Sequence, residues 1–403
     1  MSTRTTPAPE TGELPKPPAR RLRIDFRQYG ILAALVVIIG LFQALTGGRL
    51  LMPGNVNNLI QQNSYVLILA IGMVMVIIAG HIDLSVGSVV AMVGAVAALA
   101  MNEWHLPWWL AVLVALLFGA LVGAWQGFWV AFVEVPAFIV TLAGMLLFRG
   151  LTLIFLHGGT IGGLPREFVA ISAGWLPNLL GKVGRTDVLT LVLGLVACAA
   201  LVALQLSARN GRRKLDLPLE GAGQFWGKLV LAVVAIMAVC WQLANYSGTP
   251  IILLILAALI VGYSFLLNRS VFGRHIYAMG GNLFAAVMSG VKTRRVNFAI
   301  FINMGVLAAL AGVVSTSRAG GAVASAGQNY ELDAIAAVFI GGAAVQGGVG
   351  TVTGAVIGGL VMGVLNMGLS ILSVDAAWQM AIKGLVLLLA VAFDLMNKRR
   401  GGR

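Results

Sequence analysis

Long apolar runs are the feature that most constrains how this chain folds. A helix that crosses a lipid bilayer needs about 20 consecutive, mostly apolar residues, and such runs follow one another almost from end to end. They cover residues 29–46, 64–80, 87–101, 107–133, 138–156, 188–206, 229–244, 249–267, 297–316, 332–345, 350–372 and 377–395. Several runs are short or interrupted by glycine, so we expect an all-α polytopic integral membrane protein with about 10–12 transmembrane helices.

The composition agrees with this fold class and excludes several others. Hydrophobic residues make up 59% of the 403 residues and charged residues only 10%, whereas about 25% of a soluble domain is charged. A soluble enzyme, a nucleic-acid-binding domain and a protein with a single membrane anchor are therefore excluded. The 51 glycines follow no collagen-like period, which in an apolar chain indicates closely packed helices.

Lysine and arginine are distributed unevenly between alternate loops, which predicts the orientation of the chain in the bilayer. With the N-terminal segment placed inside, twenty of these residues fall in inside segments and five in outside segments. Both termini are therefore expected in the cytoplasm, with a disordered basic leader over residues 1–28 and a basic tail over 398–403. The net charge of +13 follows from this asymmetry, and we expect no nucleic-acid partner.

Residue patterns that carry catalysis or cofactor binding are not found in the sequence. Cys198 and Cys240 lie in apolar runs and are interpreted as small buried side chains, and the four histidines have no metal-ligand spacing. The nearest match to a nucleotide-binding P-loop, residues 223–229, has three residues between its glycines instead of four and ends in leucine. We expect no metal, cofactor or catalytic residue, so ATP-driven transport would need an ATPase on another chain.

The segment Gly80–Gly87 interrupts two apolar runs and contains Asp83. A carboxylate near mid-membrane costs about 2.5–3.5 kcal/mol on insertion scales, so it needs a local partner or water. We favour a structural role, in which Asp83 caps the next helix by accepting from backbone N–H groups. Two alternatives stay open: direct contact with a substrate on a translocation path that includes Ser85, and a proton relay with His81.

The loop that begins at Gly273 and Arg274 is expected to hold a short exposed helix. Asn282 is a good N-cap residue and Gly290 a good residue for the left-handed position after a helix, which leaves about two turns between them. This loop, residues 268–296, falls on the inside. The other residues that we assign to a docking helix for a partner are Gly280, Gly281, Leu283, Phe284, Ala285, Ala286, Val287 and Met288. The alternative is an interfacial helix lying on anionic lipid.

Polar residues near or inside the other runs receive structural interpretations first. Glu331 and Asp333 precede an apolar run and are expected to cap helix N–H groups, although both could face an outside vestibule. Asn366 is a single intramembrane amide that either bonds across helices or lines a path. Thr141 is a further path candidate, and Arg149 in the same run needs a partner that the sequence does not identify.

Glycine recurs at every fourth position near residue 350. Gly350, Gly354 and Gly358 repeat the small-xxx-small pattern that lets helices approach closely. We therefore expect a packing surface here, which is independent of the substrate.

Four segments, in this order, resemble the permease subunits of bacterial sugar-import ABC transporters of the ribose, xylose and galactose branch. They are GHIDLSVGSVVAM at 80–92, VPAFIVTLAGMLLFRG at 135–150, GRHIYAMGGNLFAAVMSGV at 273–291 and ELDAIAAVFIGGAAVQGGVGTVTGAVIGG at 331–359. The resemblance covers residues 30–397. It implies one permease domain over 29–397, with an additional helical hairpin at 188–244 that is similar to the xylose and multiple-sugar permeases.

The resemblance also implies the partners of the chain. These are a second copy of itself, a cytoplasmic ATP-binding subunit that the 273–290 loop contacts, and a periplasmic sugar-binding protein, at the bacterial inner membrane. The expected function is translocation of a monosaccharide such as xylose, a neutral substrate that needs hydrogen bonds and no countercharge. The alternative is a proton-coupled secondary transporter or channel that uses Asp83 and His81.

Overall fold

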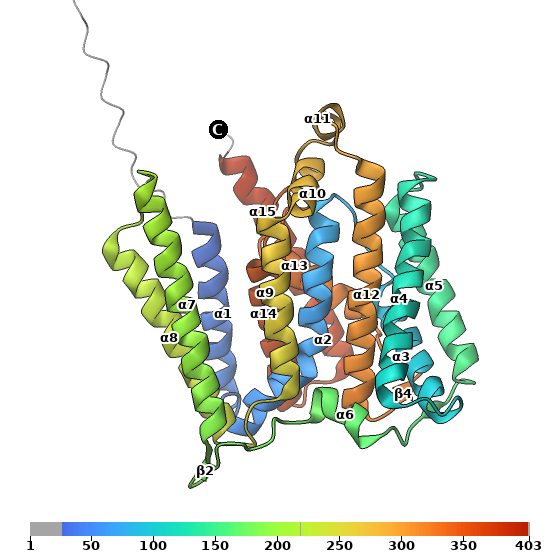
Figure 1. Cartoon of the computed structure of the whole chain (residues 1–403), viewed down its shortest axis with the longest axis horizontal. Helices are drawn as coiled ribbons and strands as arrows, with labels where there is room; N and C mark the ends of the chain where they lie inside the picture. The colour runs from blue at the N-terminus through green and yellow to red at the C-terminus, as the bar shows by residue number, and fades with distance from the viewer. Residues whose placement is uncertain (1–25, 218, 402–403) are drawn as a thin grey trace, which may run out of the picture.

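The computed structural model describes residues 26–217 and 219–401, which are mostly helical (Figure 1). The first helices are α1 (Phe26–Leu45), α2 (Pro53–Ile78), α3 (Val86–Asn102), α4 (Trp108–Ala131), α5 (Ala137–Phe155), α6 (Arg166–Ala173) and α7 (Val188–Lys214). They are followed by α8 (Ala222–Ala244), α9 (Ile251–Arg269), α10 (Val271–Gly281), α11 (Leu283–Met288), α12 (Thr293–Ala319), α13 (Tyr330–Ile340), α14 (Val352–Ile371) and α15 (Ala376–Gly401). Most of the expected leader lies outside the described residues, and the expected tail is the end of α15 except for residues 402–403.

Four two-residue strands complete the described elements. β1 (Thr160–Ile161) pairs antiparallel with β4 (Ala322–Val323), and β2 (Lys182–Val183) pairs antiparallel with β3 (Thr186–Asp187). They lie in the loops at the end of the bundle near α6 (Figure 1). We call this the α6 end and the opposite one the α11 end.

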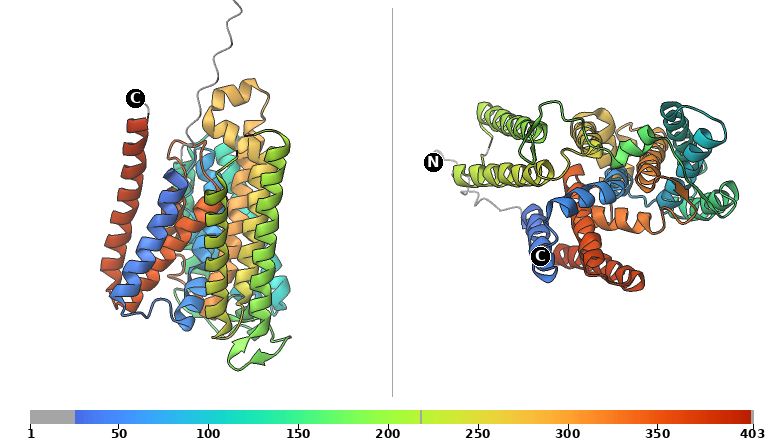
Figure 2. Two further views of the ribbon diagram at one scale, coloured as in Figure 1. Left: turned by 90° about the vertical axis from the view of Figure 1, so that its left-hand side faces the viewer. Right: turned by 90° about the horizontal axis from the view of Figure 1, so that it is seen from below.

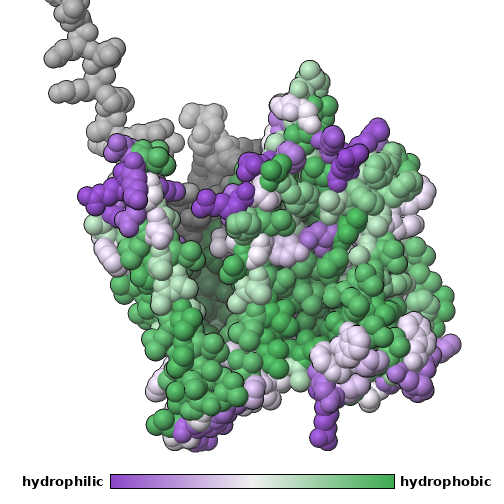
Figure 3. Space-filling model, in the orientation of Figure 1, coloured by the Kyte–Doolittle hydropathy of each residue, from purple (hydrophilic) through white to green (hydrophobic). Residues whose placement is uncertain are grey.

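The fold class predicted from the sequence is confirmed. Eight helices in the described ranges are long and apolar enough to cross a membrane, and three shorter apolar helices lie in α1, α3 and α15. The run expected over 332–345 contributes only the 11-residue helix α13, which at 1.5 Å per residue is about 16 Å long and spans half a bilayer. Figure 3 shows an apolar belt on the visible face, with hydrophilic residues gathered at both ends.

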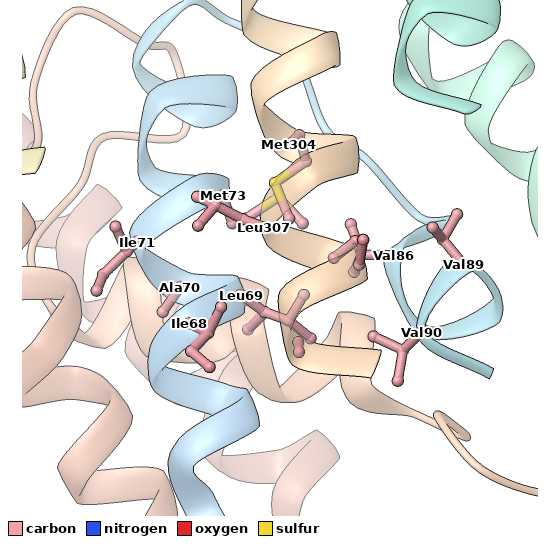
Figure 4. Close-up of a cluster of buried hydrophobic side chains, with 14 of the residues drawn as sticks. Ile68, Leu69, Ala70, Ile71, Met73, Val86, Val89, Val90, Met304 and Leu307 are labelled. Carbon is pink, nitrogen blue, oxygen red and sulfur yellow. The ribbon is translucent and has the colours of Figure 1, made fainter. Parts of the chain in front are cut away.

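Helices α2 and α12 form the centre of the bundle. Their most apolar windows are 83% and 61% buried, against 17% in each of α7 and α8, which form a hairpin at the periphery (Figures 1 and 2). Met73 on α2 and Met304 and Leu307 on α12 meet in the core (Figure 4). Gly72 permits this approach, because a Cβ there would lie 2.6 Å from Met304 Sδ. Lipid tails are as apolar as these side chains, so the hydrophobic effect does not bring helices together in a bilayer. Close packing of this kind drives their association instead.

Helices α3 and α13 start inside the bundle rather than at one of its ends, and their positions define the arrangement of the centre. α2 ends at the α11 end, and residues 80–85 lead back inward to α3, as the predicted break at Gly80–Gly87 requires. α12 ends at the α6 end, where Ser317 donates to the Phe168 carbonyl of α6, and the chain then returns inward to α13. The first turns of α3 and α13 meet, since a Cβ on Gly87 would collide with Gly327 and Glu331.

Two helix boundaries differ clearly from the expected ones. α2 begins at Pro53 rather than near residue 64, because its first turns are polar and buried, with Asn57 Nδ2 donating to Gln61 Oε1 (3.3 Å) one turn later. α7 continues to Lys214 through part of the loop expected at 207–228. Its last turn carries Arg212, Arg213 and Lys214, which interact favourably with the negative end of the helix dipole.

Candidate coupling and translocation sites

The short helix expected between Asn282 and Gly290 is present as α11. The Asn282 side chain accepts from the Ala285 N–H (2.9 Å), which satisfies a free donor of the first turn. Gly290 has a φ of +82°, the left-handed conformation that ends many helices. The capping residues predicted from the sequence are therefore confirmed, and they hold α11 as a rigid element of 6 residues.

Apolar side chains of α11 face away from the bundle. Phe284 is 74% exposed and Met288 is 72% exposed, while Leu283 and Val287 are also exposed. Ala286 is buried and fixes the opposite face of α11 to the protein. An exposed, capped apolar helix at the end of a membrane protein has the properties of a knob for the groove of a partner.

Helix α10 precedes α11 in the chain and packs against the end of α2. Gly280 lies so close that a Cβ would be 2.5 Å from the Gly348 nitrogen and 2.8 Å from the Ile78 carbonyl carbon. The Gly348 N–H donates to the Ile78 carbonyl (2.8 Å), and the Tyr277 hydroxyl donates to the Gly350 carbonyl (2.7 Å). Burial raises the pKa of Tyr277. Helix α10, the end of α2 and residues 348–350 are thus joined in one unit at the α11 end.

The remaining residues of the expected docking loop have local roles. A Cβ on Gly273 would collide with the Leu267 carbonyl, so this glycine permits the tight connection between α9 and α10. Arg274 is exposed and donates weakly to the Arg269 carbonyl (3.4 Å). Gly281 has open space around it and is not required by packing.

A cavity of about 520 Å³ opens beside this unit, and we call it the α11-end cavity. Its lining includes Gly80, His81, Pro136, Asn297 and Leu283, so α11 contributes directly to its wall. His81 Nε2 lies 3.1 Å from Asn297 Oδ1. The sequence prediction that His81 lines a path agrees with this position.

An exposed ion pair lies at the same cavity. Glu134 and Arg294 form it at 2.6 Å, and both side chains are 65% exposed. Sequence reasoning assigned no partner to either residue, because Glu134, in the loop after α4, and Arg294, in α12, are 160 residues apart along the chain.

Asp83, Ser85 and Thr141 are buried beside this cavity rather than lining it. Asp83 Oδ1 accepts from the Ser85 backbone N–H (2.8 Å) and hydroxyl (2.6 Å), which closes the turn before α3. The expectation that Asp83 is the N-cap of α3 was wrong, because Ser85 takes that position and no side chain caps the helix there. Gln126 donates to the Ser85 hydroxyl (2.6 Å). The Thr141 hydroxyl donates to the Ile82 carbonyl (3.3 Å) and holds the extended segment against α5.

Sequence reasoning was wrong about Asp333 and incomplete about Arg149. Asp333 does not cap α13. Instead it accepts from the Tyr65 hydroxyl (3.1 Å) and pairs with Lys383 (3.2 Å). Glu331 Oε2 has no hydrogen-bond partner among the described residues. The missing partner of Arg149 is the extended segment before α13, where its guanidinium donates to the carbonyls of Ala324 (3.3 Å) and Ala326 (2.7 Å).

The glycine repeat near residue 350 packs helices together, as predicted. A Cβ on Gly358 or Gly354 would collide with the backbone of α13 at Ala337 or Gly341, and one on Gly350 would lie 2.9 Å from Ile78 Cγ1. Asn366, further along α14, bonds across helices to Asn63 (3.4 Å) and lines a second cavity near the α6 end. The predicted path residues therefore do not form one cluster.

A bundle of membrane-spanning helices, interrupted by two internal helix starts and carrying an exposed capped helix, defines a multi-pass membrane protein. The chain belongs to the family described as branched-chain amino acid transport system / permease component, whose profile matches residues 55–391. Membership of this family and its bacterial relatives place it in the bacterial inner membrane.

Curated relatives confirm the resemblance seen in the sequence. The xylose transport system permease proteins of Haemophilus influenzae and Escherichia coli K12 are each 40% identical to the chain, over 94% of its length and 98% and 94% of theirs. The ribose import permease protein of Bacillus subtilis is 34% identical, over 93% of this chain and 95% of the relative. No solved structure matches the chain.

Proposed function

We propose that this chain is the membrane-spanning subunit of an ATP-binding-cassette importer that translocates a monosaccharide, xylose or a related sugar. Relatives named for xylose transport match nearly the whole chain at 40% identity, and this observation carries the proposal. A periplasmic binding protein delivers the sugar at the α6 end. A cytoplasmic ATPase subunit docks on α11, and two copies of the permease form the complete pathway.

The arrangement around α10 suggests how ATP hydrolysis elsewhere moves this chain. A push on Phe284 reaches Gly280 through two short capped helices, and Gly280 lies against Ile78 and Gly348 with no space between them. The extended segment that ends in α3 begins at Gly80, whose φ of +86° only glycine adopts at low cost. Movement of α11 is therefore expected to displace the wall of the α11-end cavity.

A proton-coupled mechanism is not favoured. Asp83 is 2% exposed and both of its short hydrogen bonds come from Ser85, so the carboxylate is occupied by its own turn. His81 faces the Asn297 amide rather than a carboxylate. A neutral sugar needs no charged relay, which agrees with this arrangement.

The docking role of α11 is tested by Phe284→Asp in the complete transporter. We expect wild-type amounts of permease in the membrane, with retention of the ATPase subunit and ATP-dependent D-xylose uptake both lowered by about tenfold or more, as for loss of an interface anchor. Leu215→Asp is the matched control, because Leu215 is 72% exposed in the loop after α7 and far from α11 in sequence. Undiminished ATPase binding by Phe284→Asp would overturn the docking role.

The homodimer is tested separately by light scattering on the purified permease. The expected protein mass is twice that of the 42.2 kDa chain. A single copy in the active, assembled transporter would contradict this part of the proposal.

A further inference from the structure

A second cavity, which we call the α6-end cavity, has a volume of about 290 Å³. It lies between α2, α12, α14 and α15, with Tyr330 of α13 in its wall. It is toward the end where Ser317 of α12 contacts α6. Its lining residues include Gln61, Tyr65, Ser315, Asn366 and Lys383.

Two buried amides in this wall each have one unused hydrogen-bonding atom. Gln61 is 2% exposed and its Oε1 accepts from Asn57, while its Nε2 has no partner among the described residues. Asn366 is 8% exposed and its Nδ2 donates to Asn63, while its Oδ1 is likewise unpartnered. A buried polar atom without a partner is costly, and it calls for a partner that the folded chain does not provide.

Of the two cationic side chains that line the α6-end cavity, the part-buried Lys383 is paired with a carboxylate. Lys383 lies 3.2 Å from Asp333, which also accepts from the Tyr65 hydroxyl. Arg318 is exposed and donates to the Asn58 side chain (3.3 Å). The Asn58 amide is neutral, so Arg318 keeps its positive charge at the exposed rim, whereas the buried amides Gln61 and Asn366 offer hydrogen bonds without a charge and suit a neutral ligand.

An aromatic pair forms another part of the wall. The rings of Tyr65 and Tyr330 stack with centroids 3.6 Å apart, and the Tyr330 hydroxyl lies 3.3 Å from the Ser315 hydroxyl. Both rings are half-buried, so they offer apolar surface next to polar edges. Such a surface suits a ligand with both C–H faces and hydroxyl groups.

We propose that the α6-end cavity is a transit subsite for a neutral monosaccharide, for which the side chains of Gln61 and Asn366 turn toward the cavity, so that Gln61 Nε2 donates to one hydroxyl group and Asn366 Oδ1 accepts from another. This inference rests on the proposed function and adds residues that select the substrate within the membrane. A hydroxyl group both donates and accepts, so one small polyol satisfies both amides. The cavity is at the lower limit of pockets for drug-sized ligands, about 300–1,000 Å³, which fits a single sugar ring.

Labelling of a cysteine in the cavity wall tests the subsite directly. Ser370 is exposed and lines the cavity, so Ser370→Cys is made in full-length protein with Cys198 and Cys240 replaced by alanine. We expect millimolar D-xylose or D-ribose to slow its reaction with a hydrophilic maleimide, and L-leucine to have no effect. Absence of protection by both sugars, or equal protection by L-leucine, would overturn the proposal.

Two substitutions then assign the contacts. Gln61→Met and Asn366→Leu are each expected to weaken the protection by sugar about fivefold to tenfold, as for loss of one hydrogen bond. Gln43→Met is the matched control, because this half-buried glutamine bonds to Gly48 and Leu51 of its own loop and does not line the cavity. Undiminished protection in both variants would refute the contacts, and if one variant fails to fold the other decides the question.

The uptake assay separates failure of the subsite from failure of the proposed function. If the complete transporter imports D-xylose with ATP but Ser370→Cys is never protected, the subsite is wrong and the proposed function stands. If the complete transporter imports neither D-xylose nor D-ribose, the proposed function itself fails.

Discussion

Replacing Gly280 with alanine tests the rigid connection between the docking helix and the membrane domain. The new Cβ would lie 2.5 Å from the Gly348 nitrogen, whereas real Cβ contacts essentially never fall below 3.0 Å. The new Cβ would also collide directly with the Ile78 carbonyl oxygen, which is the limiting contact, so the backbone must separate by roughly 1 Å or more, and overpacking of this kind costs about 1–3 kcal/mol. The hydrogen bond from Gly348 to Ile78 lies in the same contact, and its loss would add about 0.5–1.5 kcal/mol.

The assay compares Gly280→Ala with Gly281→Ala, its neighbour in the same helix. A Cβ on Gly281 meets nothing within 4 Å, so this control is expected to be neutral or to stabilise by up to about 1 kcal/mol. We expect Gly280→Ala to lower the melting temperature of the purified permease and the sugar imported per ATP hydrolysed. A Gly280→Ala protein as stable and as well coupled as Gly281→Ala would refute the reasoning.

Three further substitutions test individual contacts. Tyr277→Phe removes the hydrogen bond to Gly350 and is expected to destabilise the folded protein by about 0.5–1.5 kcal/mol, measured by thermal unfolding. We also expect a fall in the sugar imported per ATP hydrolysed, and an unchanged ratio would contradict the role of α10. Arg149→Met leaves two part-buried carbonyls without their donor and is expected to cost about 1–3 kcal/mol in total, so an unchanged melting temperature would argue against this partner assignment. The exposed pair of Glu134 and Arg294 is expected to contribute only about 0–1 kcal/mol in a double-mutant cycle, and a coupling energy well above that range would show that the pair is desolvated in the assembled transporter.

Features that depend on neighbouring residues could be predicted from the sequence. The helix α11 follows from Asn282 and Gly290, because capping is a local interaction between residues at most a few positions apart. The break at Gly80–Gly87 and the close packing at Gly354 and Gly358 likewise follow from glycine spacing. The apolar runs predicted most helices for the same reason.

Features that depend on distant partners were missed. Asp333 was expected to cap its own helix, but its partner Tyr65 is 268 residues away and Lys383 is 50 residues away. The polar start of α2 fell outside the apolar run expected at 64–80, although Pro53 at the first position and polar residues one turn apart, Asn57 and Gln61, are a signal for a helix. The α6-end cavity could not be assembled from the sequence, because five helices, α2 in the first part of the chain and α12 to α15 in the last, contribute its wall.

The driving force of transport is the most direct test of the central claim. D-xylose uptake is measured in proteoliposomes that contain the permease with its ATPase and binding protein, or the permease alone, with either ATP or an imposed proton gradient. We expect concentrative uptake only in the complete transporter with ATP, unchanged by a protonophore. Concentrative uptake by the permease alone, driven by the proton gradient and lost in Asp83→Asn, would contradict the account.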